Sequence, residues 1–310
     1  MKDKVVVLTG GVGGAKLVLG LTRVLPPDRI TAIVNTGDDF EHLGLQISPD
    51  IDTLLYTLSR KANEQQGWGR EGESWGFMDA LRSLGGEDWF LLGDGDLAIH
   101  VLRTKRKAQG DRLSAITRDF AAAWGIEATI LPMTDDNVAT FVATDEGDLP
   151  FQRYFVERRC TPVVRSVRFE GAHSAAPAPG VLDALLSEET SAIFIAPSNP
   201  YLSIDPILSV PAIRAALAEA QAPVVAISPI VGGKAVKGPT AKLMGEMGVA
   251  VSPAAIASHY EGVIDGLLVD ERDQMDIALP IASTDTLMIT LDDRARVART
   301  ALKLAQQLAA

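Results

Sequence analysis

Short runs of apolar, β-branched residues alternate with amphipathic stretches along most of the chain. Uninterrupted runs of this kind predict buried strands at residues 5–8, 30–34, 192–196 and 224–228. Apolar residues at helical spacing predict helices at residues 15–24, 50–61, 97–103, 114–124, 210–220 and 294–309. Strand, glycine-rich turn, helix and strand in succession form a βαβ unit, which builds parallel sheets covered by helices. The pattern therefore predicts an α/β fold with a doubly wound, Rossmann-like parallel sheet.

The pattern changes in the middle of the chain. Residues 131–180 are expected to form an inserted smaller mixed α/β region with antiparallel strands, within a Rossmann-like core of residues 1–130 and 181–310. The candidate strands of the insertion are residues 140–143, 152–156 and 163–169. Further short strand candidates in the core are residues 89–92, 266–270, 278–279 and 287–289.

Composition narrows the functional classes. The chain has 310 residues, of which 47% are apolar and 22% charged, so a packed core is expected. Its formal net charge of −11 disfavours binding to nucleic acid, and its one cysteine excludes an intrachain disulfide and a zinc–thiolate cluster. Its N-terminal apolar run is too short for a signal peptide, and no apolar stretch reaches 18 residues, so we expect no membrane span and a cytoplasmic location.

Gly10, Gly11, Gly13 and Gly14 stand between the first predicted strand and helix, and Lys16 follows them. A glycine-dense turn lets backbone N–H groups approach a phosphate at a helix N-terminus. The spacing is neither the dinucleotide fingerprint G-x-G-x-x-G nor a Walker A loop. Contact with a phosphate or nucleotide is therefore one interpretation, and a tight turn that needs glycine for backbone reasons is the other.

Carboxylates follow the second predicted strand. Asp38 and Asp39 come after Asn35 and Thr36 at the expected carboxyl edge of the sheet, where doubly wound folds bind ligands. Their oxygens are the ligands that Mg²⁺ prefers, although helix-capping in a polar loop is the alternative. Asp50 and Asp52 lie in the first turn of the next helix, where carboxylates also complement the helix dipole. Being two residues apart, they do not share a helix face.

Further loops carry polar or glycine residues after predicted strands or extended segments. Carboxylates on a glycine turn could hold a metal or a ligand hydroxyl, and a histidine and an arginine follow at helical spacing. Serine and asparagine between prolines could bind a base or phosphate, and glycines with lysines suit a diphosphate. The residues concerned are Asp94, Asp96, His100 and Arg103, then Ser198 and Asn199, then Gly232, Gly233 and Lys234, with Lys237 beyond.

Several of these segments together resemble the 2-phospho-L-lactate transferase family. The resemblance runs in order from near residue 4 to near residue 290. Its segments are GGVGGAKL at 10–17, NTGDDFEHLGLQISPDIDT at 35–53, LGDGDL at 92–97, HVLRT at 100–104, LPMTDDN at 131–137, APSNPYLSIDP at 196–206 and SPIVGGKAVKGPTAK at 228–242. Many relatives have a basic residue just before the LGD segment, whereas this chain has Trp89-Phe90-Leu91, so the acceptor contact there is apolar or another cation serves.

The resemblance implies a transferase of coenzyme F-420 biosynthesis. The ribityl hydroxyl of the deazaflavin FO would attack the phosphorus of a three-carbon acid linked to guanosine diphosphate, with release of GMP. Mg²⁺ is the implied cofactor, and a homodimer is expected. By matching motif, Gly10 to Gly14 would contact donor phosphates, Asp50 would contact FO, and Ser198 and Asn199 would contact the nucleotide. The implied candidates for holding Mg²⁺ or orienting the hydroxyl are Asp38, Asp39, Asp52, Asp94 and Asp96.

Two other functions are compatible with parts of the sequence. A non-catalytic regulator that binds nucleotide sugars shares the fold and the Asp-Asp loop, but typically has a glycine- and serine-rich run where this chain has Phe40-Glu41-His42. An NAD-dependent oxidoreductase is supported by the first βαβ unit alone. The sequence favours the transferase over both and leaves the identity of the three-carbon acid open.

Overall fold

The computed structural model describes residues 3–236, 238–273 and 276–310. Its centre is a seven-stranded sheet in the order β14-β13-β10-β9-β1-β2-β5, and every neighbouring pair is parallel. The strands are β1 (Lys4–Thr9), β2 (Ile30–Val34), β5 (Thr129–Pro132), β9 (Thr190–Ile195), β10 (Val224–Ile227), β13 (Gly266–Asp270) and β14 (Ile281–Thr284). The predicted α/β class with a doubly wound parallel sheet is confirmed.

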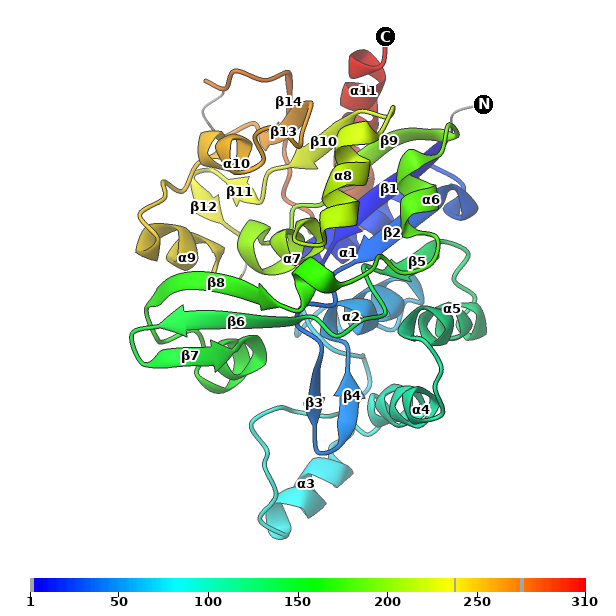
Figure 1. Ribbon diagram of the computed structural model, residues 1–310, viewed down its shortest axis with the longest axis vertical. Helices are drawn as coiled ribbons and strands as arrows, with labels where there is room; N and C mark the ends of the chain where they lie inside the picture. Colours follow the sequence, from blue (N-terminus) through cyan, green and yellow to red (C-terminus); the bar gives the residue numbers. More distant parts are fainter. Residues whose placement is uncertain (1–2, 237, 274–275) are drawn as a thin grey trace.

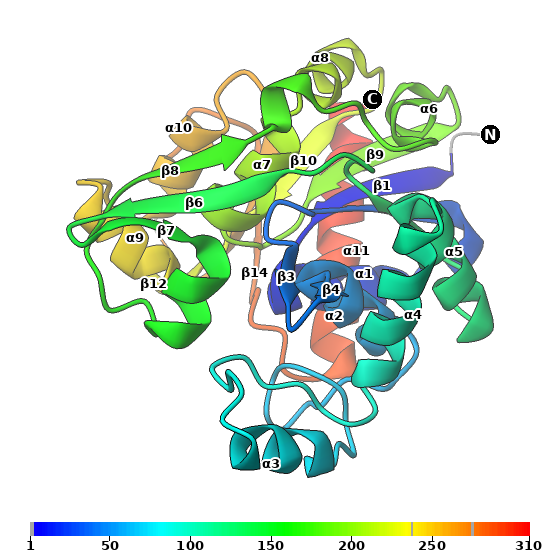
Figure 2. The same cartoon turned by 60° about the horizontal axis from the view of Figure 1, so that its bottom comes forward.

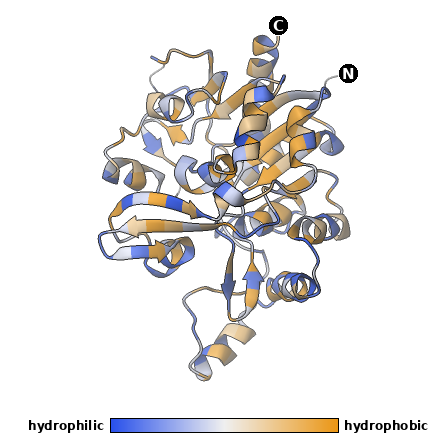
Figure 3. Cartoon of the chain, in the orientation of Figure 1, coloured by the Kyte–Doolittle hydropathy of each residue, from blue (hydrophilic) through white to orange (hydrophobic). Residues whose placement is uncertain are grey.

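Helices cover both faces of this sheet (Figures 1 and 2). One face packs against α1 (Gly11–Leu21), α2 (Pro49–Leu58), α5 (Leu113–Ala123) and α11 (Leu291–Leu308). The other packs against α6 (Val181–Leu186), α7 (Asp205–Leu208), α8 (Pro211–Glu219) and α10 (Pro253–His259). Side chains alternate between the two cores along a strand, so Val5 and Val7 enter one and Val6 and Leu8 the other. The central strands are therefore apolar along their length, as Figure 3 shows.

Smaller elements lie beyond the carboxyl ends of the sheet strands (Figure 1). The hairpin is β3 (Phe40–His42) and β4 (Leu45–Ile47), and the helices near it are α3 (Gly76–Ser83) and α4 (Leu97–Ala108). A three-stranded antiparallel sheet has β6 (Ala139–Thr144) between β7 (Gly147–Pro150) and β8 (Val164–Glu170). The remaining elements are β11 (Ile230–Val231), β12 (Lys234–Ala235), α9 (Thr240–Glu246) and the short helices η1 (Pro27–Arg29), η2 (Arg153–Glu157), η3 (Ala172–Ser174) and η4 (Pro200–Ile204).

Some local predictions were wrong. Residues 152–156 form the π-helix η2 instead of a strand, because buried Tyr154 packs with Leu202 and Leu243 under the antiparallel sheet. Residues 89–92, 278–279 and 287–289 form no strand. The first helix begins at Gly11 instead of Ala15, so the glycines belong to its first turn. The parallel sheet continues to Pro132, two residues into the segment expected to be the insertion.

No single helix among the described residues has the length and apolar character needed to cross a membrane. The pair Pro200–Leu208 and Pro211–Glu219, bent by 83°, meets that criterion together by length and composition only.

Candidate functional site at the carboxyl edge of the sheet

The topology brings two loops together where the strand order reverses. β1 lies between β9 and β2, so the segments after these strands meet at one point of the carboxyl edge, where open α/β sheets bind ligands. The hydroxyl of Ser198, after β9, donates to the carbonyl of Gly10, after β1, at 2.7 Å. The glycines of α1 allow this closeness, because a Cβ on Gly14 would lie 2.8 Å from Ser198 Oγ.

A single amide joins two carboxylates at this point. Asn35, at the end of β2, donates through Nδ2 to Asp38 Oδ1 at 2.9 Å and to Asp50 Oδ2 at 3.0 Å. The other oxygen of Asp50 accepts the backbone N–H of Gly11, the first residue of α1, at 2.6 Å. Asn35, Asp38 and Asp50 are all buried. Asp50 therefore lies at a helix N-terminus, where the helix dipole favours a negative charge.

A third carboxylate, Asp39, is next to this pair. Its Oδ2 accepts the hydroxyl of Ser48 at 2.6 Å, while its buried Oδ1 has no hydrogen-bond partner. Buried polar atoms without partners also occur on Thr36 and Asn199, which follow β2 and β9, and on Thr140 of β6. Because buried polar atoms in proteins normally have a partner, these atoms indicate that the site receives water, an ion or a ligand.

Burial dominates the electrostatics of the three carboxylates. It raises the pKa of Asp50 to about 6, although the hydrogen bonds from Asn35 and Gly11 act in the opposite direction. It raises the pKa of Asp39 to about 8, against the hydrogen bond from Ser48. The pKa of Asp38 is raised well above its usual range by burial and by the charges of Asp50 and Asp39. Such a cluster takes up protons in water and favours any cation that can replace them.

The two other predicted carboxylates near α2 and α4 belong to a separate buried network. Asp52 pairs through both oxygens with the guanidinium of Arg103, which is 1% exposed. His100 Nε2 lies 3.0 Å from Asp96 Oδ2, and Asp96 also accepts the hydroxyl of Tyr56. The side chain of His100, on α4, is buried and contacts Asp96 and Arg103, so the predicted substrate contact of His100 stays a prediction.

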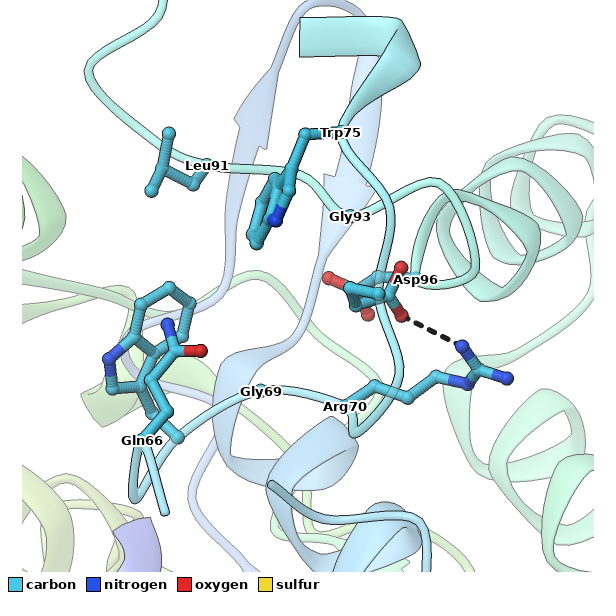
Figure 4. Close-up of a pocket in the computed structure, with 9 residues that line it drawn as sticks. Gln66, Gly69, Arg70, Trp75, Leu91, Gly93 and Asp96 are labelled. Carbon is cyan, nitrogen blue, oxygen red and sulfur yellow. Dashed lines mark hydrogen bonds and ion pairs between the residues drawn. The ribbon is translucent and has the colours of Figure 1, made fainter. Parts of the chain in front are cut away.

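Asp94 caps the start of α3. Its oxygens accept the backbone N–H groups of Gly76 and Phe77, both at 2.9 Å, and the hydroxyl of Ser74 at 2.7 Å. The adjoining pocket is lined by Gln66, Trp68, Gly69, Arg70, Glu73, Trp75, Leu91, Gly93 and Asp96 (Figure 4). Its cavity volume of about 10 Å³ is the space of one water molecule, so it is too small for a nucleotide or a deazaflavin.

The remaining predicted residues lie in different surroundings. Gly13 lies with Gly14 in the first turn of α1, whereas Lys16 Nζ donates to the carbonyl of Met288 at 2.8 Å. Asn199 caps η4 by accepting the N–H groups of Tyr201 and Leu202. Gly232 and Gly233 form the turn of the β11–β12 hairpin, and exposed Lys234 follows them. Lys237 lies outside the described residues.

Metal binding by all five predicted aspartates is not supported by their positions. No group of three or more His, Cys, Asp or Glu side chains is arranged to hold a metal within residues 3–236, 238–273 and 276–310. Asp52, Asp94 and Asp96 are engaged by protein donors, as described above. Asp38, Asp39 and Asp50 are left as the hard oxygen donors near unpartnered buried atoms.

Comparison with known proteins identifies the family. A family model described as 2-phospho-L-lactate transferase CofD matches residues 5–306. The chain belongs to the 2-phospho-L-lactate transferase family. It is 42% identical to a phosphoenolpyruvate transferase of Streptomyces griseus, with 99% of this chain and 100% of that protein covered. It is 38% identical to a 2-phospho-L-lactate transferase of Methanosarcina mazei, with 93% and 95% covered.

A solved structure shows the same fold. A UPF0052 family protein of Bacillus halodurans matches with a TM-score of 0.64 over 97% of this chain and 100% of that chain. At 18% identity this likeness concerns the fold alone. The family relationship, by contrast, makes the chain a member of a family of transferases.

Two side chains that the sequence did not point to contact the predicted acidic residues. Gln152, just before η2, lies with Nε2 3.4 Å from Asp38 Oδ2. Tyr56 follows Asp52 by one helical turn and reaches Asp96. The spacing of Tyr56 was a usable signal, but Gln152 lies in a segment that was interpreted as a strand without chemical function.

We predict that Gly10→Ala destabilises the protein through Asp50. A Cβ at this position would overlap Asp50 Oδ2 and lie 2.8 Å from Ser203 Cβ, so the neighbouring segments must move apart. We expect the free energy of unfolding in denaturant titrations to fall by about 1–3 kcal/mol. Gly245→Ala is the matched control, because its Cβ would meet no atom within 4 Å. Equal stability of the Gly10 variant and the wild type would contradict the close packing described here.

Proposed function

We propose that the chain transfers a phosphorylated three-carbon acid from a guanosine-diphosphate-linked donor to the ribityl hydroxyl of FO, in the biosynthesis of coenzyme F-420. The observation that carries this proposal is the convergence of Asp38, Asp39 and Asp50 with the N-terminus of α1 at the switch point of the sheet. Family relatives named for phosphoenolpyruvate and for 2-phospho-L-lactate support the substrate class.

The proposed reaction is a displacement at phosphorus. The hydroxyl oxygen of FO forms a bond to the phosphorus that carries the acid, and the bond from that phosphorus to the oxygen of GMP breaks. The hydroxyl proton passes to a carboxylate or to water, and GMP leaves with the bonding electrons. This chemistry depends on positioning and on neutralising phosphate charge more than on a protein nucleophile. Asp50 is the residue we assign to the hydroxyl, because burial raises its pKa to about 6 against the hydrogen bonds from Asn35 and Gly11, which suits a group that takes up a proton near neutral pH.

Mg²⁺ is the cofactor we propose. The unpartnered Oδ1 of Asp39 and the adjacent carboxylate of Asp38 are hard oxygen donors, the ligand type that Mg²⁺ prefers. Mg²⁺ is commonly held by one or two carboxylates together with substrate phosphates and water, so a closed set of protein ligands is not required. When bound, it would neutralise charge on the diphosphate.

An aromatic cluster beside the carboxylates is our candidate platform for the ring of FO. Phe40, His42, Trp89 and Phe90 are in mutual contact, with ring centroids 4.9 Å apart for the closest pairs. Arg153 lies over the Trp89 ring at 4.2 Å and follows Gln152, which reaches Asp38. Aromatic faces bind flat ring systems, and the guanidinium of Arg153 supplies a cation beside Trp89, in the segment that precedes Leu92-Gly93-Asp94.

The proposal is tested by product formation. Purified protein is incubated with FO, Mg²⁺ and, in separate reactions, donors carrying 2-phospholactate, phosphoenolpyruvate or 3-phosphoglycerate. We expect a new FO phosphodiester and an equimolar amount of GMP with at least one donor, measured by chromatography and mass spectrometry. Binding of a donor without any product under all three conditions would contradict the transferase assignment and favour a non-catalytic binding protein.

A further inference from the structure

We propose that Arg103 is a positioning residue for this transfer, holding the two elements that carry Asp39 and Asp50 and placing a buried positive charge beside them. The inference rests on the proposed function. It concerns a residue that does not touch the carboxylates assigned to the chemistry.

Arg103 uses its guanidinium as a fork. Nη1 donates to Asp52 Oδ2 at 3.1 Å, Nη2 donates to Asp52 Oδ1, and Nη1 also donates to the backbone carbonyl of Gln46 at 3.2 Å. The side chains of Arg103 and Asp52 are 1% and 7% exposed. A planar guanidinium that donates two hydrogen bonds to one carboxylate fixes the orientation of that carboxylate as well as its distance. The ammonium group of lysine fixes the distance alone.

These contacts connect α4 to both parts of the site. Asp52 lies two residues after Asp50 in the first turn of α2, and Gln46 lies two residues before Ser48, the partner of Asp39. The hydroxyl of Thr104, next to Arg103, accepts the N–H of Gln46 at 2.7 Å. Helix α4 thus binds both backbone groups of Gln46 and the first turn of α2. A shift of Arg103 would move Asp39 and Asp50 relative to each other.

The positive charge of Arg103 reaches beyond its ion pair. It interacts electrostatically with Asp39 as well as with Asp52. On its other side His100 Nδ1 lies 3.3 Å from Nη1, and His100 contacts Asp96, which accepts from Tyr56 on α2. The guanidinium therefore lies near the acidic cluster and also, through His100, near a second, partly exposed acid, Asp96.

Stability alone does not require such a pair. Replacing a buried ion pair by uncharged residues of similar volume is often neutral or stabilising, whereas removing one partner leaves an uncompensated charge and destabilises strongly. A purely structural pair and a positioning pair therefore differ in one measurable way. Neutralising both partners restores stability in either case, but it restores turnover only if the pair is purely structural.

The experiment compares Arg103→Gln, the double variant Asp52→Asn/Arg103→Gln, and Arg103→Lys in the whole 310-residue chain, with FO and Mg²⁺ saturating and the donor concentration varied. Arg294→Gln is the matched control. Arg294 lies on α11, its side chain is 6% exposed, and it forms an ion pair with Glu64. We expect the double variant to unfold near the wild-type temperature, with kcat lowered about 100-fold and donor KM changed far less. Arg103→Lys, which keeps the charge without the fork, should recover part of the kcat, and Arg294→Gln should keep wild-type kcat.

A stable double variant with wild-type kcat would overturn the inference. Should the double variant fail to fold, Arg103→Lys decides: a fall in kcat of tenfold or more supports the positioning role, and wild-type kcat overturns it. A wild type that makes no product with any donor would overturn the proposed function and this inference with it. An active wild type beside a fully active double variant would overturn the inference alone.

Discussion

Replacing Asp50 by asparagine will lower kcat by about 10³-fold, within the range expected for losing a positioned acid–base group, while the fold remains intact. The carboxylate of Asp50 accepts from Gly11 N–H and from Asn35 Nδ2. An asparagine amide keeps the size of this side chain but offers only one acceptor atom, so one of the two donors loses its partner. The variant also lacks the carboxylate charge that we propose acts on the hydroxyl of FO. Single-turnover kinetics with saturating FO and donor measure the loss.

Two controls separate chemistry from folding. Asp293→Asn alters another aspartate at a helix N-terminus, the capping box of α11, where it should lower stability slightly without affecting turnover. Asp50→Ala removes the side chain and should be at least as inactive as Asp50→Asn. Circular dichroism and denaturant titration check that both Asp50 variants fold. Near-normal product formation by either one would count against the assignment of Asp50 to the site.

The parallel sheet was predictable because its central strands are buried on both faces. Val5 to Leu8 and Val224 to Ile227 are therefore apolar without alternation, a pattern that distinguishes parallel strands from half-exposed ones. The edge strand β14, by contrast, has partly exposed residues and no such run, and the hairpin β3–β4 has strands of only three residues. Their pairing depends on contacts with distant segments, which periodicity does not reveal.

That several aspartates meet at one edge of the sheet was predictable from topology. Which of them belong to the site was predictable only in part. Asp38 and Asp39 follow β2, and Asp50 begins the next helix, so chain connectivity alone brings them near the end of β1. The two-residue spacing correctly separated Asp50, which points to α1, from Asp52, which points to α4. What Asp52 meets there depends on how α4 packs, and no local pattern shows that.

The candidate contact surface for FO draws on a part of the chain where local patterns mislead. Gln152 and Arg153 come from the segment predicted as a strand, yet Gln152 reaches Asp38 and Arg153 covers Trp89. Their proximity results from the packing of Tyr154 against η4 and α9, which are separated from it by tens of residues in sequence. Arg153 is the first residue of the π-helix η2, and nothing in the local sequence indicates that its side chain will meet Trp89. The chemistry of this surface therefore becomes visible only with the tertiary structure.

Removing divalent cations will abolish turnover, and the affinity of the protein for Mg²⁺ will rise with pH between about 6 and 8. Burial raises the pKa of Asp50 to about 6 and that of Asp39 to about 8 in the metal-free protein, so both side chains lose protons in this interval as the pH increases. A carboxyl group must be deprotonated to bind a metal, and each proton released makes the affinity about tenfold greater per pH unit. Treatment with EDTA should remove the activity, and Mg²⁺ added in excess afterwards should restore it. Calorimetry at several pH values measures the affinity of the protein for Mg²⁺.

The variant Asp39→Asn identifies the group responsible. It lacks the carboxyl with the pKa of about 8, so its Mg²⁺ affinity should be lower and should depend less on pH above 6.

The same carboxyl should make the stability of the metal-free protein depend on pH. A carboxyl whose pKa is higher in the folded than in the unfolded state stabilises the protein fully below the unfolded value near 4, and this contribution is lost as the pH rises through 8. The free energy of unfolding of metal-free wild type should therefore fall, relative to Asp39→Asn, from pH 4 to pH 8, and saturating Mg²⁺ should reverse that fall. An affinity for Mg²⁺ that does not change between pH 6 and 8 would contradict the role of these carboxylates, because a cation that displaces no protons is not binding where the protons are held.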